Sequence, residues 1–255
     1  MPNTLELIPL EGFPRVEPGD DLPELILEAL ANNKLALAAD DVLVLAQKIV
    51  SKAEGRYVRL ADVIPGERAL QLAEQADKDP RQAELILRES REVIRVRPGV
   101  VIVEHRNGYV HANAGIDKSN IPNSEDDPQV LLLPEDPDAS AEALSQSLGD
   151  LADVAPKIII NDSAGRAWRN GTVGIAIGTA GFLPLFNQVG ERDMFGNLLE
   201  VTEAAVADEL AAAASLVMGQ AAEACPVVLV RGAQLVSAAV GSESLIRDKA
   251  VDMFR

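Results

Sequence analysis

Runs of consecutive apolar residues alternate along the chain with segments whose apolar residues recur at helical spacing. Residues 42–46, 158–160 and 227–230 are almost continuously aliphatic, which is typical of strands buried on both faces. Residues 22–30 and 202–218 carry apolar side chains three or four positions apart, and this periodicity predicts amphipathic helices. Because strands and helices alternate without long spacers, the pattern predicts an α/β or α+β protein with a mixed sheet and flanking helices.

Weaker patterns fill the intervals between these segments. The dipeptide Asn107-Gly108, which lies between two apolar stretches, predicts a β-hairpin turn. The remaining expected elements are strands at residues 4–10, 94–96, 100–104, 109–113 and 130–133, and helical segments at residues 65–90 (broken near 77–80), 136–148 and 242–254. A loop is expected at residues 190–197, and no internal repeat or linker interrupts this order.

The segment that follows the buried strand 158–160 carries the most chemistry. The strand leads directly into Asn161, Asp162 and Ser163. A rigid strand would hold the carboxylate and hydroxyl oxygens at a fixed point, and these are the ligands that Mg²⁺ and Mn²⁺ prefer. The alternative interpretation is a strand that ends in an Asx-type turn with a solvated edge.

Basic residues gather at two places in this acidic chain. Gly165 is expected to permit a tight turn, after which Arg166 and Arg169 offer planar guanidinium groups that suit phosphate or carboxylate. Lys48 and Lys52 follow the strand 42–46, with two more arginines farther on. This second group could bind phosphate or could form a solvated helix face, and the segment alone does not decide between the two.

A second carboxylate lies at the end of another expected strand. Asp117 follows the strand 109–113 and is flanked by Gly115, Ser119 and Asn120. This neighbourhood repeats the combination of carboxylate, hydroxyl and amide seen around Asp162. His111 lies on the strand itself, where a single histidine is interpreted as a core or edge residue rather than a ligand.

Composition narrows the classes of function. The chain has 255 residues and a formal net charge of −17, so it repels nucleic acid and anionic membrane surfaces. Its one cysteine, Cys225, excludes an intramolecular disulfide. Since the N-terminus shows no leader pattern and no apolar run reaches the roughly 20 residues of a membrane span, a cytoplasmic protein is expected.

Several common chemistries are disfavoured by the absence of their motifs. The sequence has no phosphate-binding P-loop and no nucleophile elbow, and its glycines at 174, 178 and 181 lack dinucleotide-fingerprint spacing. One cysteine and two histidines make a zinc site unfavourable. The two strand-end carboxylates, Asp117 and Asp162, together with scattered Lys and Arg, suit a divalent cation that holds an anionic phosphate, with phosphoryl or acyl-phosphate chemistry around it.

Six motifs extend this picture, at residues 49–56, 113–120, 161–166, 168–171, 193–197 and 206–209. In this order they resemble the coenzyme F-420-0:L-glutamate ligases, which extend a deazaflavin coenzyme with γ-linked glutamates. The resemblance covers residues 8–231. It implies a single ligase domain over residues 1–255, built of two interleaved lobes in an intertwined homodimer and without a C-terminal reductase domain.

The resemblance also implies a reaction. GTP would activate a carboxylate of coenzyme F-420-0 as an acyl phosphate, and the amine of L-glutamate would then attack it. The cofactors implied are Mg²⁺ or Mn²⁺, two per site, and K⁺. The implied partners are GTP, L-glutamate, coenzyme F-420-0 and a second copy of the chain, with no nucleic acid and no membrane.

Roles for individual residues follow from the same resemblance. It implies metal ligation by Asp117, Asp162, Ser163 and Gln220, and catalytic roles for Asp117, Asp162, Lys52 and Arg166. It implies nucleotide contacts from Phe13, Pro14, Arg15, Val16, Gln47, Lys48, Lys52, Asn120, Met218, Gly219 and Gln220. Arg56, Lys118, Arg166 and Arg169 are expected to offset the charge of the anionic substrates.

The sequence departs from the family pattern at three places. Thr is expected where Asn161 stands, a pair of small residues where Gln47 and Lys48 stand, and an acidic residue where Gln220 stands. A neutral amide binds a cation more weakly than a carboxylate does, which bears on the second metal. Two alternatives stay open: a paralogue that acts on another anionic acceptor, and a nucleotide-binding dimer without turnover.

Overall fold

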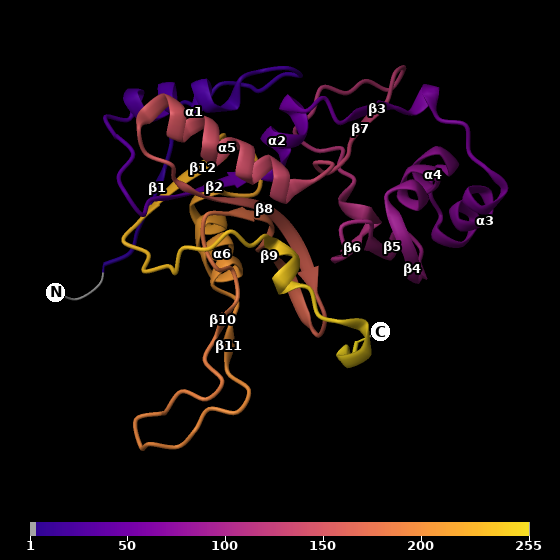
Figure 1. The fold of residues 1–255 in the computed structure, drawn as a ribbon. Helices are drawn as coiled ribbons and strands as arrows, with labels where there is room; N and C mark the ends of the chain where they lie inside the picture. Colours follow the sequence, from indigo (N-terminus) through magenta and orange to yellow (C-terminus); the bar gives the residue numbers. More distant parts are fainter. Residues whose placement is uncertain (1–3, 255) are drawn as a thin grey trace.

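A five-stranded sheet in the order β1-β12-β2-β8-β9 forms the centre of the computed structural model, which describes residues 4–254 (Figure 1). Its strands are β1 (Glu6–Pro9), β12 (Val227–Arg231), β2 (Val42–Ala46), β8 (Lys157–Arg166) and β9 (Arg169–Ala180). β2 and β8 run parallel, whereas the other neighbouring pairs are antiparallel. The predicted mixed sheet is therefore confirmed, and the three aliphatic runs are its three central strands.

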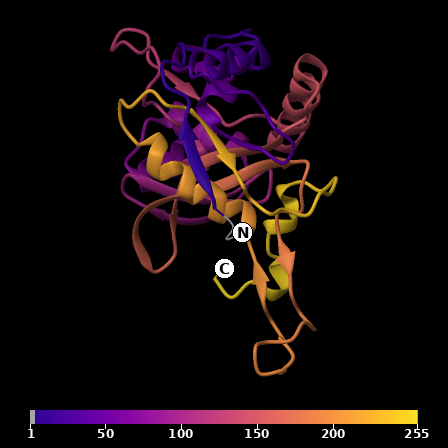
Figure 2. The same cartoon turned by 90° about the vertical axis from the view of Figure 1, so that its left-hand side faces the viewer.

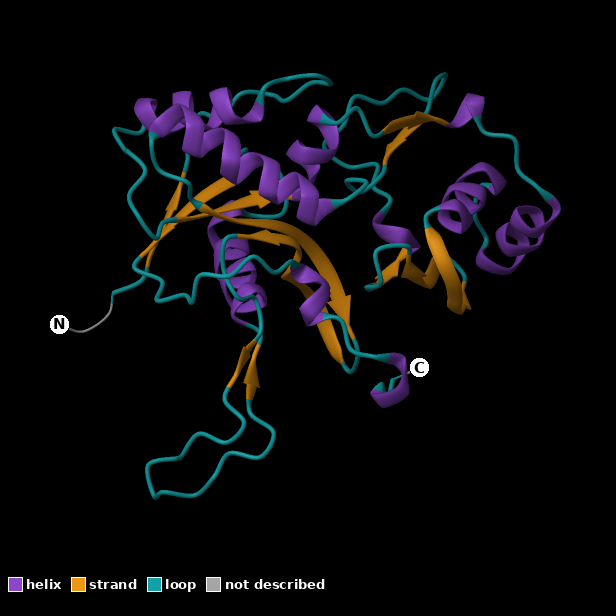
Figure 3. Cartoon of the chain, viewed as in Figure 1, coloured by secondary structure: helices purple, strands orange, loops and turns teal. Residues whose placement is uncertain are grey.

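Helices cover both faces of this sheet (Figure 3). α1 (Leu22–Asn32), α2 (Gln47–Ala53) and α5 (Pro137–Ala152) pack on one face, and α6 (Val206–Met218) packs on the other. Successive side chains alternate between the two cores: Leu43 and Ile158 belong to the first, whereas Val44 and Ile159 belong to the second. Burial on both faces explains why these strands are aliphatic at every position.

A three-stranded sheet with its own hydrophobic core stands at one end of the molecule (Figure 1). It consists of β4 (Ser90–Arg97), β5 (Val100–His105) and β6 (Val110–Ala112), against which α3 (Glu67–Ala76) and α4 (Pro80–Arg88) pack. Asp77, at φ +49°, ends α3, and Asp79 caps α4 through the backbone N–H of Arg81. The predicted break in the helical segment 65–90 is therefore confirmed.

Short elements connect the two sheets. β3 (Tyr57–Arg59) pairs with β7 (Gln129–Leu131), and the single-turn helices η1 (Leu60–Asp62) and η2 (Asn113–Gly115) lie near them in sequence. A small core that includes Leu60, Leu85 and Val130 packs this junction against α4. The polar residues 121–128, which follow the Asp117 motif, form the loop before β7.

A long arm leaves the body of the protein between β9 and α6. Only its base is regular, where β10 (Phe186–Asn187) pairs with β11 (Glu203–Ala204). Figures 1 and 2 show from two directions that the rest of the arm projects away as loop. Met194 and Phe195 near its end are 92% and 84% exposed, so the arm presents apolar side chains that nothing within the described part of this chain covers.

The expected turn after Asp162 is wrong. β8 continues through Asp162 and Ser163, and Gly165 is paired with Thr172 of β9 rather than placed in a turn. The chain reverses at residues 167–168, where Trp168 adopts φ +65°. The polar residues of β8 have weak strand propensity, but their pairing with the long strand β9, which the sequence pattern did not reveal, outweighs that preference.

Two other expectations need correction. α6 begins at Val206 rather than near residue 202, because residues 203–204 are held in the base of the arm. The C-terminal segment is not one helix but two single turns, η3 (Ser242–Leu245) and η4 (Lys249–Val251). Asp138 of α5 accepts hydrogen bonds from the backbone N–H and the hydroxyl of Ser242, which fixes this segment against α5 and β9.

None of the helices in residues 4–254 has the length and apolar character needed to cross a bilayer. The first three residues, which belong to the stretch searched for a leader pattern, and Arg255 lie outside the described residues.

Candidate functional site

The carboxyl end of β2 and the middle of β8 define the place where several of the predicted residues meet. The two strands are parallel neighbours, and Ala46 of β2 is the register partner of Asn161 of β8. The residues that follow, Gln47 and Lys48 on one side and Asp162 on the other, therefore emerge at the same edge of the sheet. Ligands of open α/β sheets commonly bind at this edge.

Helix α2 connects this edge to the second carboxylate motif. Lys48 Nζ lies 2.8 Å from the carboxylate Oδ2 of Asp117. One helical turn later, Lys52 Nζ donates a hydrogen bond of 2.7 Å to the backbone carbonyl of Asn120. Residues four apart lie on the same face of a helix, so the two lysines contact the same loop.

The loop that carries Asp117 has an unusual backbone. Asn113, Ala114 and Gly115 are consecutive residues in the left-handed region, with φ values of +53°, +55° and +68°. A side chain at Gly115 would collide with Leu133. Asp117 then forms a two-way backbone bridge with Leu131. Left-handed conformation at non-glycine residues costs free energy and is concentrated at functional sites, which marks this loop as a candidate part of the site.

A third segment, which follows α6, joins the loop to β8. Asn120 Nδ2 donates to the carbonyl oxygen of Ala221 at 3.1 Å, and Ser163 Oγ donates to Oε1 of Gln220 at 2.8 Å. Gly219, at φ +74°, turns the chain between α6 and these contacts. Four segments that are distant in sequence (α2, residues 117–120, residues 219–221 and β8) are thus linked in one contact ring.

His111 of β6 contributes a contact that the sequence interpretation missed. Its ring is buried, and Nε2 lies 3.2 Å from Oδ2 of Asp162 without hydrogen-bond geometry. The ring of Tyr109 stands edge-on to that of His111, with centroids 5.7 Å apart. His111 lies only six residues before Asp117 in the sequence, which could have suggested that it belongs to the site. Nothing in the sequence, however, indicated that β6 would face β8 and bring His111 to Asp162.

Positive charge is concentrated around Lys52. Burial lowers the pKa of Lys52 below its usual value, and the nearby charges of Lys48 and Arg15 lower it further. Arg15 is exposed, whereas Phe13 and Val16 on either side of it are packed in the core. The side chains of Phe13 and Val16 are therefore unavailable to a ligand, so within this predicted segment Arg15 and Pro14 are the accessible side chains.

Negative charge is fixed opposite these lysines. Burial alone would raise the pKa of Asp117, but hydrogen bonds from Lys48 and from the backbone N–H of Ser119 outweigh it, and the pKa lies below its ordinary value. Asp117 is therefore ionised at neutral pH. It can pair with a lysine, as it does here, or with a metal cation.

The other predicted residues either make contacts inside the protein or lie away from the contact ring. Gln47 is buried and accepts a hydrogen bond from the hydroxyl of Ser51, and Met218 is buried at the end of α6. Arg56 pairs with the buried Glu89 at 3.1 Å, so its charge is already used inside the protein. Arg166 is exposed at the end of the β8–β9 hairpin, where it donates to the carbonyl of Gly171.

The donor atoms at this site suit a hard divalent cation. Asp117 and Asp162 supply carboxylates, Ser163 a hydroxyl and Gln220 an amide carbonyl, and the buried Oδ1 of Asn161 has no hydrogen-bond partner. Among residues 4–254, no cluster of three or more His, Cys, Asp and Glu side chains gathers. Carboxylate, hydroxyl and amide oxygens are the kinds of donor that Mg²⁺ binds in proteins, where one or two carboxylates and the phosphates of a substrate commonly share the ion.

Comparison with known proteins gives a consistent result. Residues 12–232 match the family described as F420-0:Gamma-glutamyl ligase. A coenzyme F420:L-glutamate ligase of Methanothermobacter thermautotrophicus is 46% identical over 253 residues, which cover 98% of this chain and 99% of that protein. A protein of the same name from Methanopyrus kandleri is 44% identical over 98% of this chain and 97% of its own length. A third from Methanosarcina mazei is 44% identical over 89% and 85%. The chain therefore belongs to the F420-0:Gamma-glutamyl ligase family.

Proposed function

We propose that this chain joins L-glutamate to coenzyme F-420-0 through γ-glutamyl amide links, with GTP as the source of energy and an acyl phosphate as the intermediate. Its family membership and the names of its relatives support the substrates. The observation that carries the proposal is the contact ring, which brings Lys48, Lys52, Asp117, Asn120, Ser163 and Gln220 together from four distant segments.

The lysines at this ring suit a triphosphate. Burial lowers the pKa of Lys52 most, and the charges of Lys48 and Arg15 lower it further; an anionic ligand would relieve the repulsion among these three cations. The chain as a whole has a net charge of −17, which makes a local positive cluster necessary for any polyphosphate to bind. Lys48 would exchange Asp117 for phosphate oxygens when the nucleotide enters.

Asp117, Asp162, Ser163 and Gln220 would hold the divalent cations, Mg²⁺ or Mn²⁺. When bound, the cations supply charge neutralisation and polarisation at the γ-phosphate. Because Gln220 offers a neutral carbonyl in place of a carboxylate, it would bind its share of the cation more weakly. We include K⁺ in the proposal as a monovalent aid, on the resemblance alone.

The reaction proceeds in two displacements. An acceptor carboxylate oxygen attacks the γ-phosphorus of GTP, and the bond to the β-phosphate oxygen breaks to release GDP. The nitrogen of L-glutamate then attacks the acyl carbon, loses a proton and expels phosphate. In both steps Lys52, whose charge is enclosed by the loop of Asn120, would stabilise the negative charge that moves between phosphate oxygens.

The direct test is mass spectrometry of the product. Incubation with GTP, Mn²⁺, L-glutamate and coenzyme F-420-0 should give a series of products, each heavier by one glutamyl residue. Omission of GTP, or its replacement by ATP, should abolish or strongly reduce the series. A protein that binds GTP and yields no heavier product would contradict the proposal and would point to another acceptor or to a binding role.

We also propose that the functional unit is a homodimer. The arm between β10 and β11 exposes apolar side chains that would be poorly solvated in a monomer, with Phe195 near its end 84% exposed and Val201 near its base 86% exposed. Exposed apolar groups that gather on a projecting segment are typical of protein interfaces. A second copy is the occupant that the family resemblance implies.

Replacing Phe195 with Asp should therefore convert the dimer to a monomer, because a charge in an apolar interface loses its solvation without gaining a partner. Light scattering coupled to size-exclusion chromatography measures the mass. Ile64→Asp is the matched control, since Ile64 is also 84% exposed but lies outside the arm. A wild-type protein that elutes as a monomer, or a Phe195 variant that stays dimeric, would show that the arm does not hold the dimer.

A further inference from the structure

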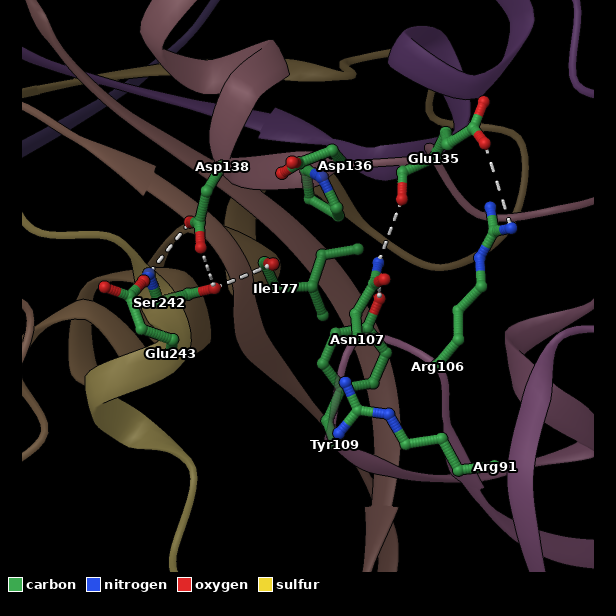
Figure 4. Close-up of a pocket in the computed structure, with 11 residues that line it drawn as sticks. Arg91, Arg106, Asn107, Tyr109, Glu135, Asp136, Asp138, Ile177, Ser242 and Glu243 are labelled. Carbon is green, nitrogen blue, oxygen red and sulfur yellow. Dashed lines mark hydrogen bonds and ion pairs between the residues drawn. The ribbon is translucent and has the colours of Figure 1, made fainter.

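A cavity of about 220 Å³ lies between the β5–β6 turn, the start of α5, strand β9 and the C-terminal turn η3 (Figure 4). It is smaller than the ~300–1,000 Å³ typical of pockets for drug-sized ligands, and so suits a metabolite of amino-acid size. None of the site residues assigned above lines it. It therefore lies outside the contact ring.

Opposite charges face each other across this cavity. In Figure 4, the guanidinium groups of Arg91 and Arg106 lie on one side, where the carboxylate of Glu135 stands 3.9 Å from Arg106, and the carboxylates of Asp138 and Glu243 lie on the other. Such an arrangement is complementary to a zwitterion, because one wall attracts carboxylate and the other attracts ammonium.

The polar groups on both walls have capacity for a ligand. Arg106 has carboxylate neighbours, with Nη2 3.4 Å from Glu89 and Nη1 3.9 Å from Glu135, and Arg91 lies 3.6 Å from Glu104. Nε and Nη2 of Arg106 are nevertheless buried and make no hydrogen bond, and buried N–H groups ordinarily make one, so these two atoms have capacity for a ligand. Asp138 accepts hydrogen bonds from the backbone N–H of Thr179 and from the N–H and hydroxyl of Ser242, which are all neutral groups. The ammonium group of a ligand would give this carboxylate a charged partner.

The cavity lies close to the predicted catalytic edge by two routes. Ile177 lines it, and Ile175, two residues away on β9, is the register partner of Asp162. Two strand residues span about 7 Å. Tyr109 also lines the cavity and packs edge-on to His111, which stands beside Asp162. Because Ile177 and Asp138 are on the same side, the acidic wall is the one continuous with the strand that leads to Asp162.

We propose that this cavity binds L-glutamate, with its carboxylates on Arg91 and Arg106 and its amino group toward Asp138 and Glu243. The inference rests on the proposed function, because it names the subsite of one of that reaction's substrates. It places the attacking nitrogen at the wall nearest β9. The carboxylates at that wall are positioned to take the proton that the amine loses before attack.

The test compares Arg91→Gln and Arg106→Gln with wild type in steady-state ligation assays. Loss of a charge-assisted hydrogen bond should raise the KM for L-glutamate by about 10- to 100-fold while the KM for GTP stays within about twofold. Arg88→Gln is the matched control, because Arg88 pairs with Glu84 along α4 and does not line the cavity. Arg91 is partly exposed, so its variant keeps the test valid if the Arg106 variant folds poorly.

Calorimetry with L-glutamate, in the presence of Mn²⁺ and a non-hydrolysable GTP analogue, separates this inference from the proposed function. If wild type forms no glutamyl product, the proposed function fails. Glutamate binding that the Arg91 variant loses would still support the subsite. An unchanged glutamate KM in both variants, or glutamate binding that is absent in wild type or equal in all proteins, overturns the subsite.

Discussion

Replacement of Asp162 by Asn is expected to lower kcat/KM for glutamyl transfer by at least about 100-fold, with the fold unchanged. The side chain lies within β8, next to the position that pairs with the last residue of β2, and it is partly exposed and beside His111, so it contributes little to the core. Asn keeps the shape and removes the charge. A divalent cation held partly by this carboxylate would lose an anionic ligand, and the γ-phosphate would lose the polarisation that depends on it.

The measurement is the rate of product formation as Mn²⁺ concentration is varied, with circular dichroism to verify folding. A variant that regains part of its activity at high Mn²⁺ would identify the defect as weaker metal binding. Asp150→Asn provides the control, since Asp150 is an exposed carboxylate on α5 away from the strand ends. Near-normal turnover by the Asp162 variant at low Mn²⁺ would remove this residue from the catalytic machinery.

Replacement of Gly178 by Ala is expected to destabilise the protein by about 3 kcal/mol, the upper part of the range for overpacked positions. A Cβ atom at residue 178 would lie 2.6 Å from the carbonyl carbon and 2.7 Å from Cβ of Pro137. Pro137 begins α5, so the clash is with the backbone of a packed helix and cannot be relieved by rotation of a side chain. β9 and α5 would have to separate, which opens the core between them.

Thermal unfolding should show a decrease in Tm of roughly 6–12 °C for the Gly178 variant, at 2–4 °C for each kcal/mol in a chain of this size. Gly165→Ala is the matched control, because it lies on the neighbouring strand and a Cβ there meets nothing within 4 Å. Its Tm should change by no more than about 2 °C. A large loss at Gly165 instead would favour the tight turn expected from the sequence over the extended strand observed.

The central sheet could be predicted because its strands are buried on both faces. An amphipathic helix or a surface loop would contain polar residues, and the runs at 42–46, 158–160 and 227–230 contain none. Each of these runs forms a central strand. The outer strand β9 was missed. Its Arg169, Asn170, Gly171 and Thr172 resemble a loop, and only pairing with β8 makes them extended. Local preference is weak evidence where the partner strand decides the conformation.

Part of the site could be predicted because its polar residues come directly after apolar runs in the sequence. Asp117 and Asp162 were selected because each follows a strand, and the structure places each beside a basic residue or an imidazole. The pairing of Lys48 with Asp117 and the approach of His111 to Asp162 could not be predicted, because both depend on how the three-stranded sheet stands against the five-stranded one. The cavity at Arg106 depends on the same placement.

The contact ring also has a consequence for how the protein folds. Its hydrogen bonds join residues that are 68, 101 and 57 positions apart in the chain. Contacts of such separation form late, since the loops they close must first lose their conformational entropy. The strands 42–46 and 158–160 would therefore pair before the ring is complete, and binding of the proposed nucleotide would report the finished molecule rather than a folding intermediate.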